Sequence, residues 1–565
     1  MKKTNFCRWT FLCIMTMSLF VSTLSAQEKE GVAYRQLPVK VYRDKMKAGW
    51  IGQIVGVCWG APTEFRWRDA IIPEKDVPQW TPDMINNAFG QDDLYVEMTF
   101  LRSMEEYGLD VSIRQAGIDF ANSEYPLWCA NDAGRKNLRM GIAPPDSSHP
   151  HFTKCPNDID YQIEADFSGL ISPGMPNNAV QLGEKFGRLM NYSDGMYAGQ
   201  FMGAMYSEAF FEKDIIKIIE AGLKAIPEKC QYAEMVRDLL KWFDENPEDW
   251  QATWQLCQKK YREDPEYQQC SNGGIDVKIN GAYVLLGLLY GKGDLDQTIL
   301  ISMRAGQDSD CNPSSSAGVL FTTLGFSALP DRYSAELNET KVFDHTDYHF
   351  PALIDVCERL TRQSLERIGG FVKTDNNGDE VFFIPVIEPT PSKLVFSWDP
   401  EPIADLKYSE EELKQIKFRE YSLAESVSQR FPGWSISDCG PDMNPGILKE
   451  YRGQENVLMT HPLNKTTACV LSCDTKIAQD KSTLRLVVSH FVTDPKSDWE
   501  LIVKVDDKEI HKQLVDQKSV DAKGWVTIDV PLKDYVDKNV NIKLLNQPNS
   551  WSYEAAYWSN IEFVP

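Results

Sequence analysis

The sequence is poor in paired cysteines and in histidine. Its 13 cysteines are scattered along 565 residues without paired CxxC clusters, and only seven residues are histidine. Cysteines scattered in this way do not form a disulfide-stabilised scaffold. The sequence alone does not answer whether isolated disulfides form, for example between Cys469 and Cys473.

Positive charge is also in deficit. The formal net charge is −23, and removing residues 1–26, which hold three basic residues and no acidic ones, makes it more negative still. A protein that neutralises phosphates needs the opposite sign of charge. The composition therefore argues against a nucleic-acid partner. It also argues against a polyanionic substrate unless a metal ion or a local basic patch intervenes.

Long apolar runs are confined to the N-terminus. Lys2 and Lys3 precede an apolar stretch from Phe11 to Leu24, and small residues offer a cleavage site after Ala26. This is the pattern of a secretory signal peptide, so we predict that residues 1–26 are removed and that the protein is secreted or periplasmic. The stretch is too short to favour a membrane span. The cleavage point has no cysteine that would carry a lipid anchor.

The length predicts two or three domains. Residues 36–370 show apolar residues at helical spacing, and small residues recur in the run RDKMKAGWIGQIVGVCWG. Small residues let a neighbouring helix approach closely. A Gly-Lys-Gly turn at 291–293 separates two further predicted helices,. We therefore predict an all-α domain over residues 36–370.

After residue 370 the composition changes. Residues 371–424 are rich in proline and asparagine, which predicts a linker or a small β extension,. Residues 425–565 contain short alternating runs at regular spacing, which predict an all-β sandwich of jelly-roll, galactose-binding-like type,. We expect it to be an accessory, carbohydrate-binding-like domain. Its tryptophans could stack on sugars, although burial is the simpler expectation for most of them: Trp434, Trp499, Trp525, Trp551 and Trp558,.

The acidic motif RAGQDSDCNPSSSAG, residues 304–318, places Asp308 and Asp310 between two predicted helices. Gly306 suits the end of the first helix, and Asn312 and Pro313 suit the start of the second. Adjacent carboxylates repel unless a positive charge lies between them, and Mg²⁺ and Ca²⁺ prefer such oxygen ligands. A cation site is one interpretation. A solvated acidic turn is the other, and it is the commoner for an isolated DxD motif.

Two further acidic positions lie nearer the N-terminus. Glu64 follows the glycine-rich helix in GAPTEF, and Asp92 and Asp93 begin a predicted helix in FGQDDLYVEM. The helix dipole by itself favours acids at such a position. The Asp92–Asp93 pair taken alone is therefore equally compatible with a structural role.

Residues 138–160 form a predicted proline-rich loop, and loops of that length are commonly functional or disordered,. We expect its two histidines, His149 and His151, to be exposed rather than metal-binding. The acids that follow are Asp158, Asp160, Glu164 and Asp166. Asp160 and Glu164 are four residues apart and could share one helix face. Such a pair can divide acid and base roles, and a solvated helix face is the equal alternative.

Taken together, these motifs resemble the ADP-ribosylglycohydrolase family. The resemblance covers residues 40–330 and rests on a glycine-rich helix with GxPxE, an Asp–Asp helix start and a GxDxDxN loop, which is the most specific of the three. The matching residues are Gly52, Gly56, Gly60, Pro62, Glu64, Asp92, Asp93, Gly306, Asp308, Asp310 and Asn312.

The resemblance implies an all-α domain with a divalent-cation centre of Mg²⁺ or Mn²⁺, and Ca²⁺ and the choice between one ion and two stay open. It implies metal ligands at Asp92, Asp93, Asp308 and Asp310, with Glu64 beside them, and cleavage of a glycosidic bond at C1 of a ribose. Gln91 and Cys311 stand where the family usually has threonine. We include Gln91 among the candidate ligands, whereas a thiol is a poor partner for Mg²⁺.

The candidate catalytic residues are Glu64, Asp93, Asp160 and Glu164. The candidate substrate-binding residues are Asn131, Arg135, Asp158, Asp166 and Asn280, of which Asn280 also suits a helix cap.

Three functions follow as hypotheses. The first is a secreted, metal-dependent glycoside hydrolase acting on a carbohydrate or ribosyl substrate. The predicted secretion signal favours it, as do the two missing threonines and residues 128–177, where the short Gly-Asn stretch of the family is not clear. The second is an ADP-ribosyl hydrolase acting on a protein or nucleotide conjugate. The third is a non-catalytic glycan-binding protein, against which the four aspartates at the proposed metal site argue. The sugar, the linkage and the stereochemical outcome stay open.

Overall fold

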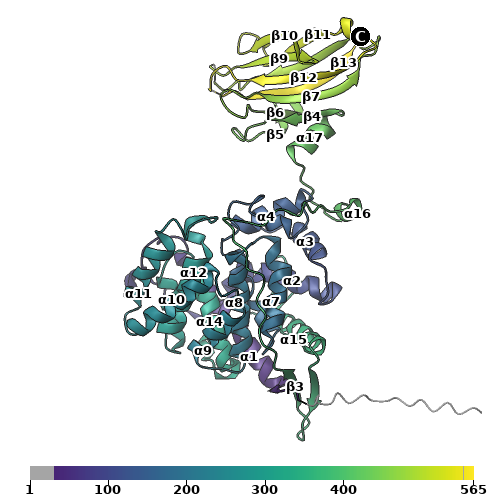
Figure 1. Ribbon diagram of the computed structural model, residues 1–565. Helices are drawn as coiled ribbons and strands as arrows, with labels where there is room; N and C mark the ends of the chain where they lie inside the picture. Colours follow the sequence, from purple (N-terminus) through teal and green to yellow (C-terminus); the bar gives the residue numbers. More distant parts are fainter. Residues whose placement is uncertain (1–30, 495, 552) are drawn as a thin grey trace, which may run out of the picture. The chain divides into compact units, whose positions relative to one another are not determined.

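The computed structural model describes residues 31–494, 496–551 and 553–565, so the predicted signal peptide lies outside the described residues. The chain divides into two compact units (Figure 1). The first takes in the chain up to Leu138 and then Ile142–Gln415, and the second takes in Arg139–Gly141 and Ile416–Pro565. Across the described ranges, no helix combines the length and the apolar character needed to span a bilayer.

The first unit is predominantly helical, which confirms the predicted fold class for this part of the chain. Its earlier helices are α1 (Val39–Gly60), α2 (Asp92–Tyr107), α3 (Ile113–Ala121), α4 (Cys129–Arg139), α5 (Asp160–Ile163), α6 (Asp166–Leu170), α7 (Pro176–Phe186) and α8 (Asp194–Ala209). Its later helices are α9 (Ile215–Lys224), α10 (Gln231–Glu245), α11 (Trp250–Cys257), α12 (Val277–Tyr290), α13 (Leu295–Arg304), α14 (Cys311–Leu324), α15 (Phe350–Arg367) and α16 (Glu410–Leu413).

Helices α1 and α14 pack backbone against backbone, and the glycines of α1 make this possible. A Cβ atom added at Gly56 would lie 2.3 Å from the carbonyl oxygen of Pro313. One added at Gly60 would lie 2.1 Å from the carbonyl oxygen of Ser309 and 2.5 Å from the Cα of Asp310. Only glycine fits at these separations, so the small residues of α1 let the DxD loop rest against the end of this helix.

The segment after α15, where we expected a linker or a small β extension, packs on the helical unit. Its strands β2 (Phe371–Thr374) and β3 (Glu380–Pro385) join β1 (Tyr34–Pro38) in an antiparallel sheet of order β1-β3-β2. Further along, the hydroxyl of Ser193 donates to the carbonyl of Val395 at 2.7 Å. The hydroxyl of Tyr197 donates to the carbonyl of Lys393 at 2.6 Å. Backbone carbonyls of this segment are therefore satisfied by α8 and the residue before it.

The second unit contains the short helix α17 (Leu423–Arg430) and two antiparallel sheets. One has the order β10-β9-β12-β7-β4 and the other the order β11-β8-β13-β6-β5. The strands are β4 (Trp434–Ser437), β5 (Gly446–Tyr451), β6 (Gln454–Thr460), β7 (Cys469–Lys476), β8 (Thr483–Ser489), β9 (Trp499–Val505), β10 (Lys508–Val515), β11 (Val526–Pro531), β12 (Asn539–Gln547) and β13 (Ala556–Val564).

One apolar core joins the two sheets and confirms the predicted β-sandwich. Trp499 on β9 and Trp558 on β13 come from different sheets, and their ring centroids lie 5.2 Å apart. Trp434 and Trp525 are also buried, whereas Trp551 is partly exposed. Most of the tryptophans that could have stacked on sugars are therefore part of the core, which confirms the expectation that most of them are buried.

The cysteines of the described ranges are free thiols. Cys469 and Cys473 both lie on β7, four residues apart. Four residues of a strand span about 13 Å, which is beyond the reach of a disulfide. The pairing that the sequence left open therefore does not occur.

Candidate metal centre

The DxD loop connects α13 to α14. Gly306 follows the end of α13 with φ +88°, as expected of a glycine that ends a helix,. The expected cap at Asn312 is wrong, because α14 already begins at Cys311 and Asp310 is its N-cap residue. The side-chain amide of Asn312 instead donates to Asn280 Oδ1 at 2.9 Å, which ties α14 to α12.

Two groups of three side chains converge at this loop. In the first, Asp93, Asp310 and Cys311 each offer a ligand atom, and these atoms lie within 4.8 Å of one another. In the second, Glu64, Asp308 and Asp310 do the same. We call the first group the mixed triad and the second group the oxygen triad. Asp310 belongs to both, so it joins a residue from the turn after α1, one from the start of α2 and one from the loop before α14 into one site.

The aspartates of both triads are buried without enough partners. Asp93, Asp308 and Asp310 are 1%, 4% and 3% exposed, so the alternative of a solvated acidic turn is wrong. The Oδ1 atom of each has no hydrogen-bond partner among the described residues. Buried, unpaired carboxylates are costly unless a positive charge compensates them. The donor set of carboxylate oxygens fits a divalent cation.

The pKa values of these acids are raised, as expected of carboxylates that are buried close to one another. Burial raises the pKa of Asp308 to about 7. Burial, and then the charges of Asp310 and Asp92, raise the pKa of Glu64 to about 7. Burial and neighbouring acids hold the pKa values of Asp93 and Asp310 well above their ordinary range. A bound cation would reverse these shifts, because it favours the charged form of every carboxylate around it.

Gln91 and Asp92, two of the candidate ligands, stand outside both triads. They are the residue before α2 and its first residue, and both line the cavity described next. Cys311, which was not among the candidate ligands, belongs to the mixed triad instead. Its Sγ donates a hydrogen bond to Asp93 Oδ2 at 3.3 Å, and the residue is only 5% exposed.

A cavity of about 670 Å³ opens over the oxygen triad. Its acidic lining residues are Glu64, Asp92, Asp160 and Asp308, and its aromatic ones are Phe65, Tyr95 and Trp128. Arg68 and the amides Asn131 and Asn272 also line it. Trp128 is 59% exposed, which is unusual for so large an apolar side chain,. The lining of the cavity thus combines acidic residues with an aromatic surface that is free to contact a ligand.

Asp160 and Asn131 lie together at this cavity. The Oδ1 atom of Asp160 accepts from the backbone N–H of Asn131 at 2.9 Å, and its Oδ2 atom accepts from that of Ala130 at 3.3 Å. The side-chain amide of Asn131 donates to Glu164 Oε1. Burial raises the pKa of Asp160 to about 7 and holds that of Glu164 well above its ordinary range. Asp160 and Glu164 therefore meet through Asn131, although Glu164 is not among the residues that line the cavity.

The two remaining acids of this segment have partners inside the fold. All four acids are at most 6% exposed, so the alternative of a solvated helix face is wrong. Asp158 accepts from the backbone and side-chain amides of Asn272 at 2.8 and 3.0 Å. Asp166 accepts from the hydroxyl of Tyr206 at 2.9 Å and from that of Ser315 at 3.4 Å. Neither lines the cavity.

Arg135 and Asn280, two other candidate substrate contacts, are also engaged elsewhere. Arg135 donates to the carbonyl of Tyr125 at 2.6 Å. The side-chain amide of Asn280 donates to the carbonyls of Gly274 and Asp276, each at 3.0 Å. Asn131 is therefore the one candidate substrate contact that lies at the cavity.

The proline-rich loop before Asp160 is packed rather than exposed along most of its length. His149 is 7% exposed, and its ring contacts the carbonyl of Glu401 at 2.7 Å, so the expectation of an exposed side chain is wrong for this residue. His151 is exposed as expected. Neither histidine belongs to a metal-binding group within the described ranges.

Trp128, Tyr95, Phe65 and Arg68 were missed at the level of the sequence. Phe65 and Tyr95 lie in the motifs GAPTEF and FGQDDLYVEM, but the functional interpretation of these motifs rested on their acidic residues, and aromatic residues are common throughout this chain. Two of these places have an unusual backbone: φ is +51° at Phe65 and +48° at Cys129, which follows Trp128 and begins α4. A backbone in that region is uncommon for a residue other than glycine, but it cannot be recognised before the structure is known.

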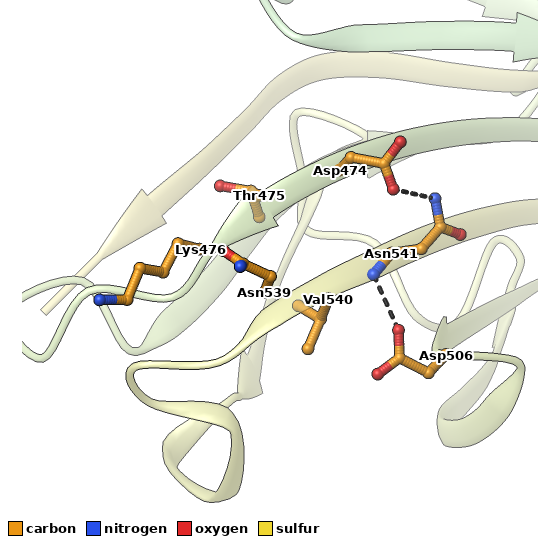
Figure 2. Close-up of a pocket in the computed structure, with 7 residues that line it drawn as sticks. All are labelled: Asp474, Thr475, Lys476, Asp506, Asn539, Val540 and Asn541. Atoms are coloured by element: carbon orange, nitrogen blue, oxygen red, sulfur yellow. Dashed lines mark hydrogen bonds between the residues drawn. The ribbon is translucent and has the colours of Figure 1, made fainter.

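The second unit has a cavity of its own, of about 470 Å³ (Figure 2). Asn541 on β12 lies between two acids there. Its side-chain amide donates to Asp474 Oδ1 at 2.8 Å, and its backbone N–H donates to Asp506 Oδ1 at 2.9 Å. These contacts join β7, β12 and the turn after β9.

The fold and the triads agree with a comparison to known families. The sequence profile of the ADP-ribosylglycohydrolases matches residues 38–367, which is more than half of the chain, so the chain belongs to this family. Membership points to glycohydrolase activity, and the family is typically dependent on divalent metal ions. A search of the curated proteins found no match.

Three solved structures match parts of this chain at low identity. A structure described as an ADP-ribosylglycohydrolase-related protein complex shares 14% identity with a TM-score of 0.37, over 57% of this chain and 99% of that one. The CBM35 of Paenibacillus barcinonensis shares 12% identity with a TM-score of 0.17, over 24% of this chain and 94% of that one. A Bacillus subtilis family 43 arabinoxylan arabinofuranohydrolase, solved with cellotetraose, shares 12% identity with a TM-score of 0.15, over 23% of this chain and 28% of that one.

Proposed function

We propose that the protein is a secreted, metal-dependent glycoside hydrolase that cleaves a glycosidic bond of a carbohydrate substrate. One observation carries this proposal: the oxygen triad, whose buried aspartates have unpartnered oxygens, reaches a cavity through Glu64 and Asp308, and an exposed tryptophan lines the same cavity. The charge pattern of residues 1–26 supports secretion,.

Asp93, Asp308, Asp310 and Glu64 would hold the divalent cations. When bound, the cations supply Lewis acidity toward the sugar hydroxyls and the attacking water. Asp310 would be shared by both positions, because it is common to the two triads. Asp92 lines the cavity beside them and adds negative charge that favours cation binding,.

Glu64 is the residue to which we assign proton transfer. It is the exposed member of the oxygen triad, and its carboxyl group lines the cavity. In the absence of a cation its pKa is about 7, and a cation in the oxygen triad would lower it, so we assign Glu64 the role of a general base rather than of a general acid,. Glu64 would therefore contact both the ion of the oxygen triad and the substrate in the cavity.

Asp160 and Asn131 are assigned to orienting the substrate. The backbone at the start of α4 holds both oxygens of Asp160, which fixes the carboxylate at the cavity wall. Asn131 is held in turn through Glu164. Groups held in this way lose little freedom when a sugar hydroxyl binds to them.

Two features favour a neutral glycan as the substrate. The exposed ring of Trp128 offers a flat apolar surface, and the axial C–H bonds of a sugar ring suit such a surface,. The cavity also has one basic lining residue, Arg68, against several acids. Where the bound cations do not offset it, this negative lining would disfavour a substrate that carries a diphosphate.

The alternative is hydrolysis of an ADP-ribosyl group, and family membership is the observation that favours it. A panel of p-nitrophenyl glycosides and neutral oligosaccharides, tested beside ADP-ribosylated arginine and serine peptides, separates the two. The assays use the full chain with Mg²⁺ or Mn²⁺, and Asp310→Asn serves as the inactive control. Release from a glycoside alone supports the proposal, and release from ADP-ribosylated peptides alone contradicts it.

A further inference from the structure

We infer that the two triads bind unlike ions. The oxygen triad, Glu64, Asp308 and Asp310, takes a hard cation such as Mg²⁺ or Mn²⁺. The mixed triad, Asp93, Asp310 and Cys311, takes a thiophilic divalent cation such as Zn²⁺ or Co²⁺. This inference rests on the metal dependence in the proposed function, but not on which bond the protein cleaves.

The position of Cys311 carries the inference. Its Sγ atom is one of three ligand atoms that lie within 4.8 Å of one another, and all three residues are buried. The Sγ lies 3.3 Å from Asp93 Oδ2, while the Oδ1 atoms of Asp93 and Asp310 have no hydrogen-bond partner among the described residues. The sulfur and two unsatisfied carboxylates therefore face one point, and a single ion could contact all three.

The chemistry of the donor atoms then distinguishes the two positions. Mg²⁺ and Ca²⁺ take oxygen ligands, whereas thiolate selects softer ions. Zn²⁺ bonds to cysteine sulfur at about 2.3 Å and commonly uses three protein ligands at a site that stays open to substrate. On binding, the sulfur donates an electron pair to the ion and the thiol proton passes to solvent. No oxidation is involved.

Two other cysteines lie near the site without sharing this arrangement. Cys129 lines the cavity but belongs to neither triad. Cys58 is buried, and its Sγ contacts the carbonyl of Ile85 at 3.7 Å. Cys129 is therefore a suitable control, because it tests whether any thiol at the cavity is enough to hold a soft ion.

Cobalt substitution tests the inference directly. The full chain is stripped of metal with a chelator, and Co²⁺ is added to the parent protein, Cys311→Ser and Cys129→Ser. A sulfur-to-cobalt charge-transfer absorption in the near ultraviolet is expected for the parent and for Cys129→Ser, and it is expected to be lost in Cys311→Ser. Absence of the band from the parent at saturating Co²⁺, or its persistence in Cys311→Ser, would overturn the inference.

Metal content provides a second measurement that needs no spectroscopic band. The parent and Cys311→Thr are dialysed against equal concentrations of Mg²⁺, Mn²⁺ and Zn²⁺, and circular dichroism checks that the variant is folded. The parent should retain Zn²⁺ together with Mn²⁺ or Mg²⁺. Cys311→Thr should lose at least about 10-fold in Zn²⁺ affinity, because even partners outside the direct ligands contribute roughly 10- to 100-fold. Equal Zn²⁺ retention by both proteins contradicts the inference.

Neither measurement contains a substrate, so the two proposals fail separately. A protein that shows the cobalt band but hydrolyses no glycoside contradicts only the proposed function. A protein that hydrolyses a glycoside with Mg²⁺ or Mn²⁺ in both positions contradicts only the assignment of Cys311.

Discussion

The sulfur of Cys311 lies 3.3 Å from Asp93 Oδ2, although the two residues are 218 positions apart in the chain. Cys311 is the first residue of α14, and Asp93 is in the first turn of α2. The contact joins two helix N-termini at a single point, and Asp310 completes the group. Both halves of the candidate metal centre therefore meet at positions where helix dipoles favour negative charge.

The first prediction concerns the residue that the two triads share. Asp310→Asn should remove both ions, whereas Asp308→Asn should remove only the ion of the oxygen triad, because only Asp310 belongs to both groups. Activity should fall by more than the roughly 10- to 100-fold that outer-shell partners of a metal contribute. Metal analysis and steady-state kinetics measure this, with Asp83→Asn at an exposed position as the control. Full metal content in Asp310→Asn would contradict the shared role.

The second prediction concerns pH and stability. In the metal-free protein the pKa of Asp308 lies at about 7, above its ordinary value of 3.8, and that of Glu64 is raised as well. Between pH 3.8 and about pH 7, the folded state therefore binds more protons than the unfolded state. Stability should therefore be highest at acid pH and should fall as the pH rises through about 7. The loss from pH 5 to pH 8 should be at least about 1.4 kcal/mol, the equivalent of one pKa unit.

A divalent cation should flatten this dependence, because it stabilises the ionised carboxylates. Urea unfolding of the full chain at pH 5 and pH 8, with chelator and then with Mn²⁺, measures both effects. Asp308→Asn should reduce the slope of the metal-free protein. Greater stability of the metal-free protein at pH 8 than at pH 5 would show that these carboxylates are compensated in another way.

The third prediction concerns the support of the DxD loop. A Cβ atom at Gly60 would lie 2.5 Å from the Cα of Asp310, so Gly60→Ala should push the loop away from α1. We expect a loss of about 1–3 kcal/mol in stability, typical of overpacking, together with weaker metal binding. Gly446→Ala is the control, since an added Cβ there meets nothing within 4 Å. Thermal unfolding and metal titration compare the two, and equal behaviour would exclude a supporting role for Gly60.

The fourth prediction concerns Trp128 and depends on the proposed glycan substrate. Trp128→Ala should raise KM for an oligosaccharide by roughly 2- to 10-fold, since aromatic contacts contribute about 0.5–1.5 kcal/mol. The value of kcat should change little, because the ring is assigned to binding rather than to chemistry. Tyr107→Ala, at an exposed aromatic outside the cavity lining, is the matched control. Unchanged KM in Trp128→Ala would remove the main support for a stacked sugar.

Much of the fold could be predicted because it depends on local patterns. Apolar spacing predicted the helices, and alternation predicted the strands of the β-sandwich. The glycines of α1 also carried information, since Gly56 and Gly60 do allow the close approach to α14. The cap at Asn312 was wrong by two residues, because Asp and Asn both suit that position and the choice depends on packing against α12,.

The candidate site, like the fold, could be predicted from the sequence only in part. Residue type and spacing are enough to identify the available carboxylates, because the motifs around Glu64, Asp93, Asp308 and Asp310 can be recognised in the sequence. The packing of distant segments is needed to establish that Asp310 is common to two triads and that Cys311 faces Asp93. The same packing is needed to establish that Asp158 and Asp166 are engaged within the fold while Trp128 stands exposed at the cavity. The physical reason is that burial and convergence arise from contacts between residues distant in the chain, which local periodicity does not encode.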